Sequence, residues 1–177
     1  RGVEPRVVGH SIRALRVHEP RLRWRVPASL PAQVEGATVL GALRRAKYLL
    51  FPLDGAALER VPRGTPAALL VHLGMSGSLN FAPSQGPAGK HDHMDLVTTQ
   101  GVLRLHDPRR FGAAVWAESE HHEPAAKLLG KLGMEPLTDG FELKLFQQGL
   151  KKRAAPIKQV LLAGDVVVGV GNIYASE

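Results

Sequence analysis

Between Ile12 and about Trp116, short apolar runs rich in valine, leucine and alanine alternate with turn signals. Two such signals are the pairs Asp54-Gly55 and Gln100-Gly101. Short apolar segments bounded by turn residues are typical of strands that pair with their neighbours along the chain. This part of the sequence is therefore predicted to form an antiparallel β domain.

One of these runs, RLRWRV at residues 21–26, alternates arginine with apolar residues. A strand here would carry Arg21, Arg23 and Arg25 on one face and apolar side chains on the other. A solvated outer face is the favoured interpretation of these arginines.

The pattern changes after Ala117. Residues 123–133, 141–153 and 156–164 space their apolar side chains as short amphipathic helices. Pro156 suits the first turn of the third helix and Gly164 its C-terminal end. Residues 172–177 begin like a further helix, with Asn172 as its N-cap. A helical part is therefore predicted to follow the β domain.

Composition limits the classes of partner and site. Lysine and arginine total 23 against 16 aspartates and glutamates, which gives a net charge of +7. Such an excess favours a polyanionic partner, with nucleic acid ahead of an anionic membrane surface. The absence of cysteine excludes disulfides and thiolate metal sites within these residues and is compatible with the cytoplasm. No apolar run reaches the roughly 20 residues that span a bilayer, and the first residues do not show the charged-then-apolar pattern of a leader.

The segment HDPRRFG at residues 106–112 is unusual for a loop. Turn residues and small polar groups suffice in most loops, whereas this one carries Arg109, Arg110 and Phe111. The pattern indicates that the loop contacts a partner.

Two further segments carry candidate residues in apolar surroundings. Lys47 lies between two arginines and an apolar run, and is either aimed at a phosphate, carbonyl or sugar or is an edge lysine that prevents aggregation. The strand that contains His72 leads into a glycine-rich turn that carries Met75. His72 is either functional or a half-buried histidine, and Met75 either projects from the turn or fills a gap in the core.

The segment KHDHMDL offers an alternative function. His91, His93 and Asp95 are spaced so that they share one face of a strand, and two imidazoles with a carboxylate would suit zinc or iron. A metallohydrolase is therefore the rival hypothesis. Hydrogen-bonded histidines explain such spacing more often.

A basic cluster surrounds the start of the third predicted helix. It contains Lys151, Lys152, Arg153 and Lys158, and two glycines precede Asn172 further on. Unpaired N–H groups at a helix N-terminus bind anions, so Asn172 marks either an anion site or a simple cap.

Five segments occur together and in order: RRAKYLL, HLGMSGSL, KHDHMDL, DPRRFG and VGVGNIYASE. In this combination the chain resembles a bacterial formamidopyrimidine-DNA glycosylase. The resemblance runs through nearly the whole chain. It implies an α+β fold, in which an antiparallel β-sandwich N-terminal domain is followed by the beginning of a helical helix–two-turn–helix domain. Duplex DNA would bind in the cleft between them.

The resemblance also assigns roles to individual residues. Residues that match Met75, Arg109 and Phe111 fill the gap left by the flipped nucleotide: Phe111 wedges between bases and Arg109 pairs with the orphaned cytosine. Lys47, the one expected catalytic residue, clamps phosphates around that nucleotide together with His72 and Asn172. His91 and Arg153 contact DNA, and Lys158 lies near the lesion.

The sequence departs from the family pattern at its ends. The nucleophilic N-terminal proline of the family and the glutamate that follows it are not among these residues, nor is the C-terminal four-cysteine zinc finger. We therefore expect a fragment truncated at both ends and inactive alone, cut from a parent with a zinc site. The expected domains are residues 1–118, the sandwich, and residues 119–177, the start of the helical domain.

The implied activity of the parent is base-excision repair. The enzyme would excise oxidised purines such as 8-oxoguanine and formamidopyrimidines from duplex DNA, then nick the abasic site by β,δ-elimination. It would be a cytoplasmic, nucleoid-associated monomer that binds double-stranded damaged DNA and no membrane. A non-catalytic DNA-binding fragment is the alternative.

Overall fold

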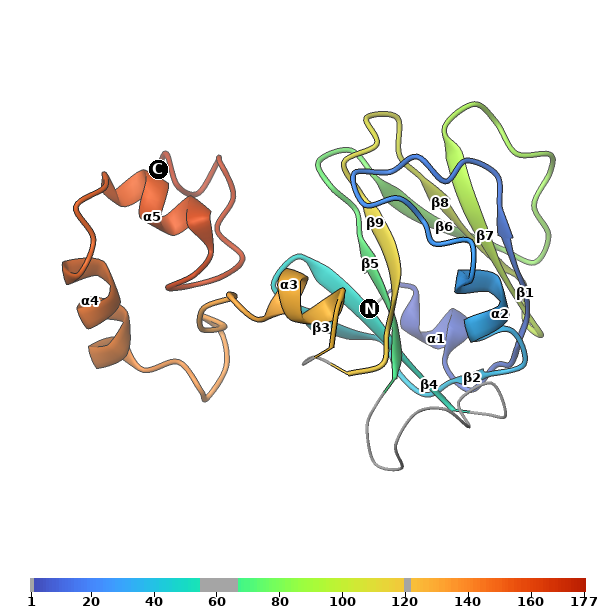
Figure 1. The fold of residues 1–177 in the computed structure, drawn as a ribbon, viewed down its shortest axis with the longest axis horizontal. Coiled ribbons are helices and arrows are strands. Elements are labelled where there is room, and N and C mark those ends of the chain that lie inside the picture. Colours follow the sequence, from blue (N-terminus) through green and yellow to red (C-terminus); the bar gives the residue numbers. More distant parts are fainter. Residues whose placement is uncertain (1, 55–66, 120–121) are drawn as a thin grey trace.

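The computed structural model describes residues 2–54, 67–119 and 122–177, and two antiparallel sheets face each other in its first part (Figure 1). The first sheet has the spatial order β1 (Ile12–Val17), β7 (Asp92–Thr98), β8 (Val102–His106) and β6 (Ser78–Ala82). The second has the order β2 (Thr38–Val39), β4 (Tyr48–Asp54), β5 (Ala68–His72) and β9 (Ala113–Ala117), and β3 (Leu43–Arg45) pairs with β4. The predicted antiparallel β domain is confirmed.

The second sheet is buried on both of its faces. In β5, Leu69 and Val71 point into the core shared with the first sheet, whereas Ala68 and Leu70 belong to a separate cluster on the outer face. This division follows from the period of two along a strand. It explains why β5 and β9 are almost continuously apolar instead of alternating with polar residues.

Three short helices cover the sandwich. Helices α1 (Glu4–Val7) and α2 (Leu30–Val34) contribute Val7, Leu30 and Val34 to the core between the sheets. Helix α3 (Ala125–Leu129) packs Ala125 and Leu129 onto the outer face of the second sheet. Helices α1 and α2 were not predicted from the sequence.

The helices α4 (Leu143–Lys151) and α5 (Ile157–Ala163) form a separate group beside the sandwich (Figure 1). Both coincide with predicted helical segments. Pro156 is the N-cap of α5 and Gly164 ends it with φ of 74°, a left-handed conformation that glycine adopts without a Cβ clash.

Two local predictions were wrong. Residues 21–26 form no strand, because Leu22 and Val26 both donate to the carbonyl of Pro20 and Trp24 makes only an isolated bridge with Ala113. The alternation nevertheless separates buried Leu22 and Val26 from exposed arginines. Residues 172–176 form successive turns rather than a helix.

The turn at Gln100-Gly101 is present between β7 and β8, where the Thr98 amide donates to the Gly101 carbonyl at 2.8 Å. Gly55, of the other predicted turn, lies outside the described residues. Among the residues described, none of the helices has the length and apolar character needed to cross a bilayer.

Candidate nucleic-acid interface

Two loops cross between the sheets at the same end of the sandwich. Residues 73–77 connect β5 to β6, and residues 107–112 connect β8 to β9. Because His72 pairs with Ala113 and Ser78 pairs with His106, both loops begin and end at neighbouring positions. The glycine-rich turn and the DPRRFG segment, far apart in the sequence, therefore lie side by side.

Glycine is required where the two loops touch. A Cβ on Gly74, whose φ is 65°, would lie 2.7 Å from the carbonyl carbon of Phe111. A Cβ on Gly112 would lie 2.7 Å from the carbonyl oxygen of His72. Both distances are shorter than a van der Waals contact, so a side chain at either position would separate the loops.

The carboxylate of Asp107 fixes the conformation of both loops. Its Oδ1 accepts hydrogen bonds from the hydroxyl of Ser76 and the amide of Arg109, each at 3.2 Å. Its Oδ2 accepts from the amide of Gly112 at 2.8 Å. Asp107 is fully buried, so these bonds form without competition from solvent.

With their backbones fixed in this way, the loops present large side chains to solvent. Met75 is 67% exposed and Phe111 is 40% exposed. The guanidinium of Arg109 lies 4.9 Å from the centre of the Phe111 ring, within the range of a cation–π contact. The loops therefore carry an exposed apolar pair with an arginine stacked on it.

A cleft of about 640 Å³ opens beside these side chains. Its lining is basic and apolar, and consists of Arg21, Leu22, Arg23, Lys47, His72, Gly74, Met75, Arg110 and Phe111. One nearby carboxylate, that of Glu19, is bonded to Arg21 at 2.5 Å and lies 3.6 Å from Arg110. The hydrogen bonds from Arg21 lower the pKa of Glu19 to about 2, so Glu19 stays ionised.

Lys47 reaches this cleft from the tip of the β3–β4 hairpin. Arg45 pairs with Tyr48, which leaves Ala46 and Lys47 as the two turn residues, and Ala46 has a φ of 53°. The Nζ of Lys47 donates to the carbonyl oxygen of Val170 at 3.2 Å. Lys47 therefore connects the sandwich to the segment that follows α5, two residues before Asn172.

The hairpin is held in place by Glu135. This carboxylate accepts from the amide of Ala46 at 2.5 Å and from Arg44 and Arg45 at 2.9 and 3.2 Å. Burial alone would raise the pKa of Glu135, but the hydrogen bonds from Ala46, Arg45 and Arg44 outweigh burial and lower the pKa below its usual value.

His72 lies on the wall of the cleft as a neutral ring. Its Nδ1 accepts a hydrogen bond from the amide of Gly74 at 2.9 Å, so the proton of the neutral ring is on Nε2. Partial burial, and after it the positive charges of Lys47 and Arg23, lower the pKa of His72. The Nε2–H group is thus available as a donor.

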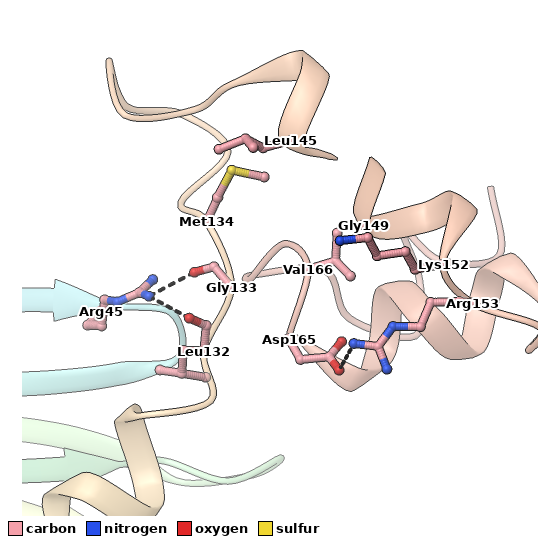
Figure 2. A pocket seen from close by; sticks show the side chains of 10 residues that line it. All are labelled: Arg45, Leu132, Gly133, Met134, Leu145, Gly149, Lys152, Arg153, Asp165 and Val166. Atoms are coloured by element: carbon pink, nitrogen blue, oxygen red, sulfur yellow. Dashed lines mark hydrogen bonds and ion pairs between the residues drawn. The ribbon is translucent and has the colours of Figure 1, made fainter. Parts of the chain in front are cut away.

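A second cleft, of about 660 Å³, is lined by the segment that follows α3, by α4 with the two residues after it, and by the segment that follows α5 (Figure 2). Arg153 and Asp165 are joined there at 2.6 Å, and Arg45 donates to the carbonyls of Leu132 and Gly133 (Figure 2). Elsewhere in this region, the Nζ of Lys158 donates to the hydroxyl of Ser176 at 2.7 Å, and that hydroxyl donates to the carbonyl of Asn172.

Comparison with known proteins agrees with this geometry. Residues 1–114 match the model of the formamidopyrimidine-DNA glycosylase N-terminal domain, and residues 132–177 match that of the formamidopyrimidine-DNA glycosylase H2TH domain. This chain belongs to the formamidopyrimidine-DNA glycosylase family.

Individual members of the family match over the entire chain or nearly so. The formamidopyrimidine-DNA glycosylase of Variovorax paradoxus is 55% identical over 177 residues, which are 100% of this chain and 61% of the relative. That of Albidiferax ferrireducens is 54% identical over 171 residues, 97% of this chain and 58% of the relative. The chain thus spans about three fifths of the length of these relatives.

Solved structures of the family match as well. The Lactococcus lactis enzyme, bound non-covalently to DNA that contains an AP site, superimposes with a TM-score of 0.83 at 33% identity, covering 100% of this chain and 64% of that one. The Thermus thermophilus MutM (Fpg) protein gives a TM-score of 0.80 at 35% identity, covering 100% of this chain and 59% of that one. The predicted fold class is confirmed.

The structure brings together some of the site residues that the family resemblance predicted. Lys47, His72, Met75 and Phe111 line one cleft. Arg109 stacks on Phe111 at its rim. Arg153, Lys158 and Asn172 lie on the helical part of the chain.

His91 does not line this cleft but lies next to the start of the DPRRFG loop. Its carbonyl accepts from the amide of Asp107 at 2.9 Å, and its ring contacts that of His106 edge-on at 5.9 Å.

The rival hypothesis, a metallohydrolase with a metal site at His91, His93 and Asp95, was wrong. In His93, Nδ1 lies 2.9 Å from the carbonyl of Glu19 and Nε2 lies 2.9 Å from that of Asp107, which leaves no ring nitrogen for a metal. Asp95 is paired with Arg104. A β-bulge between Asp92 and Met94 also breaks the alternation on which the hypothesis depended. Within the described part of the chain, no three such side chains come together around a metal position.

Sequence reasoning gave no individual role to four residues of this site. Arg21, Arg23 and Arg110 line the cleft, although the favoured interpretation placed Arg21 and Arg23 on a solvated outer face. The alternation of arginine with apolar residues at 21–26 was the available signal for Arg23. Glu135 has no local signal, because its partners lie about 90 residues earlier in the chain.

Proposed function

We propose that this chain is the lesion-probing part of a bifunctional DNA glycosylase and abasic-site lyase that excises oxidised purines from duplex DNA. The observation that carries this proposal is the pairing of two loops that expose Met75 and Phe111 beside a basic cleft. Exposed apolar side chains of this size, on loops fixed by a buried carboxylate, suit insertion between base pairs. Solved structures of the Lactococcus lactis relative contain damaged DNA, which supports damaged duplex DNA as the partner of this chain.

The residues divide into two groups by their chemistry. Phe111 and Met75 would enter the base stack, and Arg109, stacked on Phe111, would hydrogen-bond the unpaired base. Removing a base from the stack costs a few kcal/mol, which such contacts offset. Lys47 and the Nε2–H group of His72 would bind phosphates that flank the extruded nucleotide. Lys47 is proposed to hold these phosphates next to the reacting sugar.

The second group extends onto the helical part. Arg153, Lys158 and Asn172 are proposed to contact the same DNA molecule, together with His91 on the sandwich. The Lys47–Val170 hydrogen bond supports this arrangement, because it brings the segment before Asn172 to the cleft. We place the division between the two domains at residues 118 and 119.

The zinc finger of the family does not fit residues 1–177. The sequence has no cysteine, and the residues with described structure form no alternative ligand cluster. Zinc is therefore proposed only for the longer protein. We further propose that this protein is a monomer of the bacterial cytoplasm, where its substrate is located.

The decisive experiment compares two duplexes. One contains a stable abasic-site analogue opposite cytosine, the other is undamaged, and the affinity of this chain for each is measured across a salt series. We expect a preference for the damaged duplex of about tenfold or more, equivalent to about 1.4 kcal/mol. This preference should persist as salt lowers both affinities.

A matched pair of variants sharpens the comparison. Met75→Ala combined with Phe111→Ala should remove the preference for the damaged duplex. Leu137→Ala, at an apolar residue that is 91% exposed and does not line the cleft, should leave it unchanged. Equal, steeply salt-dependent binding of both duplexes by the unsubstituted chain would instead identify a non-catalytic DNA-binding fragment.

A further inference from the structure

All the N–H groups of the Arg104 guanidinium, on β8, donate hydrogen bonds within the protein. Its Nε and Nη2 donate to the two carboxylate oxygens of Asp95, both at 2.7 Å. Its Nη1 donates to Asp92 at 3.3 Å. The remaining bonds go to the carbonyls of Gly86 at 2.9 Å and Pro87 at 3.4 Å. These five bonds account for the five N–H donors of an arginine.

The two carbonyls belong to a segment that lies outside the sheets. Residues 83–91 connect the end of β6 to the start of β7, and most of them are exposed. At its second end the amide of Gly89 donates to Asp92 at 2.8 Å. Arg104 and Asp92 therefore fasten the segment to the first sheet from its middle to its end.

The fastened end lies beside the DPRRFG loop. Asp92 pairs with His106, the last residue of β8, and its Oδ1 lies 2.9 Å from the Nδ1 of His106. The ring of His106 contacts that of His91, whose carbonyl accepts from the amide of Asp107. Next to His91, Lys90 is exposed and has no ion pair among the residues described.

We propose that Arg104 is a positioning residue that holds the 83–91 segment so that Lys90 and His91 contact the DNA backbone beside the inserted DPRRFG loop. The proposal rests on the proposed function and adds to it a phosphate contact, Lys90, and the residue that places it. Arg104 itself is only 8% exposed, so its proposed role is to position the segment and not to contact DNA.

The contacts argue against a role confined to the sheet. A pair between Asp95 and Arg104, which face each other across β7 and β8, would be sufficient to join these strands. The bonds to Gly86 and Pro87 contribute nothing to that pairing, and they need the planar fork of arginine. Lysine has one nitrogen and cannot reach both a carboxylate and two carbonyls in these directions.

The test is a double-mutant cycle in which Arg104→Lys is one change and the pair Lys90→Ala with His91→Ala is the other. Arg104→Lys, the pair Lys90→Ala with His91→Ala, and all three together are compared for affinity to the abasic-analogue duplex across a salt series. Hydrogen exchange of the amides of Gly89 and Asp92, which are hydrogen-bonded at the attached end of the segment, is measured without DNA. Arg13→Lys, at an exposed arginine on β1, is the matched control. Each variant is first checked for folded structure by circular dichroism.

We expect Arg104→Lys to speed exchange in the segment and to weaken DNA binding about three- to tenfold. The slope of log affinity against log salt should fall by about one phosphate contact. In the background without Lys90 and His91, the same substitution should change affinity by less than about twofold, because the side chains it positions are absent. Arg13→Lys should change neither measurement.

Specific results would overturn the proposal. Unchanged exchange in Arg104→Lys would show that Arg104 does not hold the segment. A full effect of Arg104→Lys in the absence of Lys90 and His91 would show that it acts elsewhere. If Arg104→Lys does not fold, Asp92→Asn, which weakens the same attachment, should show the same pattern to a smaller extent.

The hydrogen-exchange measurement also distinguishes a failure of the proposed function from a failure of the positioning role of Arg104. A failure of the unsubstituted chain to bind either duplex would contradict the proposed function, and with it the DNA contacts of Lys90 and His91. Exchange of the Gly89 and Asp92 amides needs no DNA and decides by itself whether Arg104 fastens the segment.

Discussion

The sandwich and the group formed by α4 and α5 are built in different ways. The sandwich encloses a core to which both sheets and the helices α1 and α2 contribute. Helix α4 has no buried residue, and its Leu143 and Leu145 are exposed. In the helical group, burial is concentrated in Val160 and in the segment from Val166 to Val168.

The contacts that join these two regions are mainly polar. Arg45 donates to the carbonyls of Leu132 and Gly133, and Lys47 donates to that of Val170. The Gly133 amide donates to Gly164, and backbone bonds also join Met134 to Val166 and Val168. The two loops that expose Met75 and Phe111 are thus fixed by a hydrophobic core and a buried carboxylate. The side of the cleft that carries Lys47 is instead held by hydrogen bonds, which are individually weaker.

The largest contrast is expected from apolar truncation in the two regions. Leu105→Ala removes a fully buried side chain between the sheets, close to the start of the DPRRFG loop. It should lower the free energy of unfolding by about 2–5 kcal/mol. Leu145→Ala, on α4 and 49% exposed, should cost less than about 1 kcal/mol. Urea denaturation measures both, and equal losses would contradict the comparison.

Glu135→Gln tests the polar junction itself. The substitution removes the charge that receives Arg44, Arg45 and the amide of Ala46, and should cost about 2–3 kcal/mol. Hydrogen exchange should become faster in residues 157–177 and remain slow in β5 and β9. Glu142→Gln, at the exposed N-cap of α4 that makes no side-chain cap bond, is the control. Faster exchange throughout the sandwich would show that the junction is not local.

Lys47→Gln tests the same junction where it borders the cleft that is proposed to bind DNA. Loss of the charge should weaken binding to damaged and undamaged duplexes alike, by about three- to tenfold, and reduce the salt slope by about one contact. Lys144→Gln, at an exposed lysine of α4, is the charge-matched control. A selective loss for the damaged duplex alone would assign Lys47 to lesion recognition and not to phosphate binding.

The comparison also explains which features were predictable from the sequence. The strands and the helices α4 and α5 follow local periodicity, and Gly164 ends α5 where its lack of a Cβ permits a left-handed backbone. Residues 21–26 show the limit of such patterns. Their alternation identified the buried residues, but a strand also needs backbone partners, and the carbonyl of Pro20 takes two of these amides.

Contacts between distant segments were not accessible to spacing alone. That the glycine-rich turn lies against the DPRRFG loop depends on both crossing between the sheets at one end, and only the family resemblance linked Met75 to Phe111. The metal hypothesis failed for a related reason, because one bulge at β7 changes which side chains share a face. Glu135 and its arginine partners are joined only in the folded chain.

The smallest expected effect concerns the pH dependence of stability at the cleft wall. Burial and the charges of Lys47 and Arg23 lower the pKa of His72 in the folded chain, so the unfolded chain takes up this proton first as the pH falls. The contribution is fully present above the ordinary histidine pKa of about 6.5 and is lost as the pH falls from there through the lower folded value. His72→Gln should therefore make the decline of the free energy of unfolding between pH 7 and pH 5 shallower. Leu137→Gln, at an exposed residue that does not titrate, should leave the slope of the unsubstituted chain unchanged. An identical slope in the His72 and Leu137 variants would show that the basic wall of the cleft does not disfavour the protonated ring.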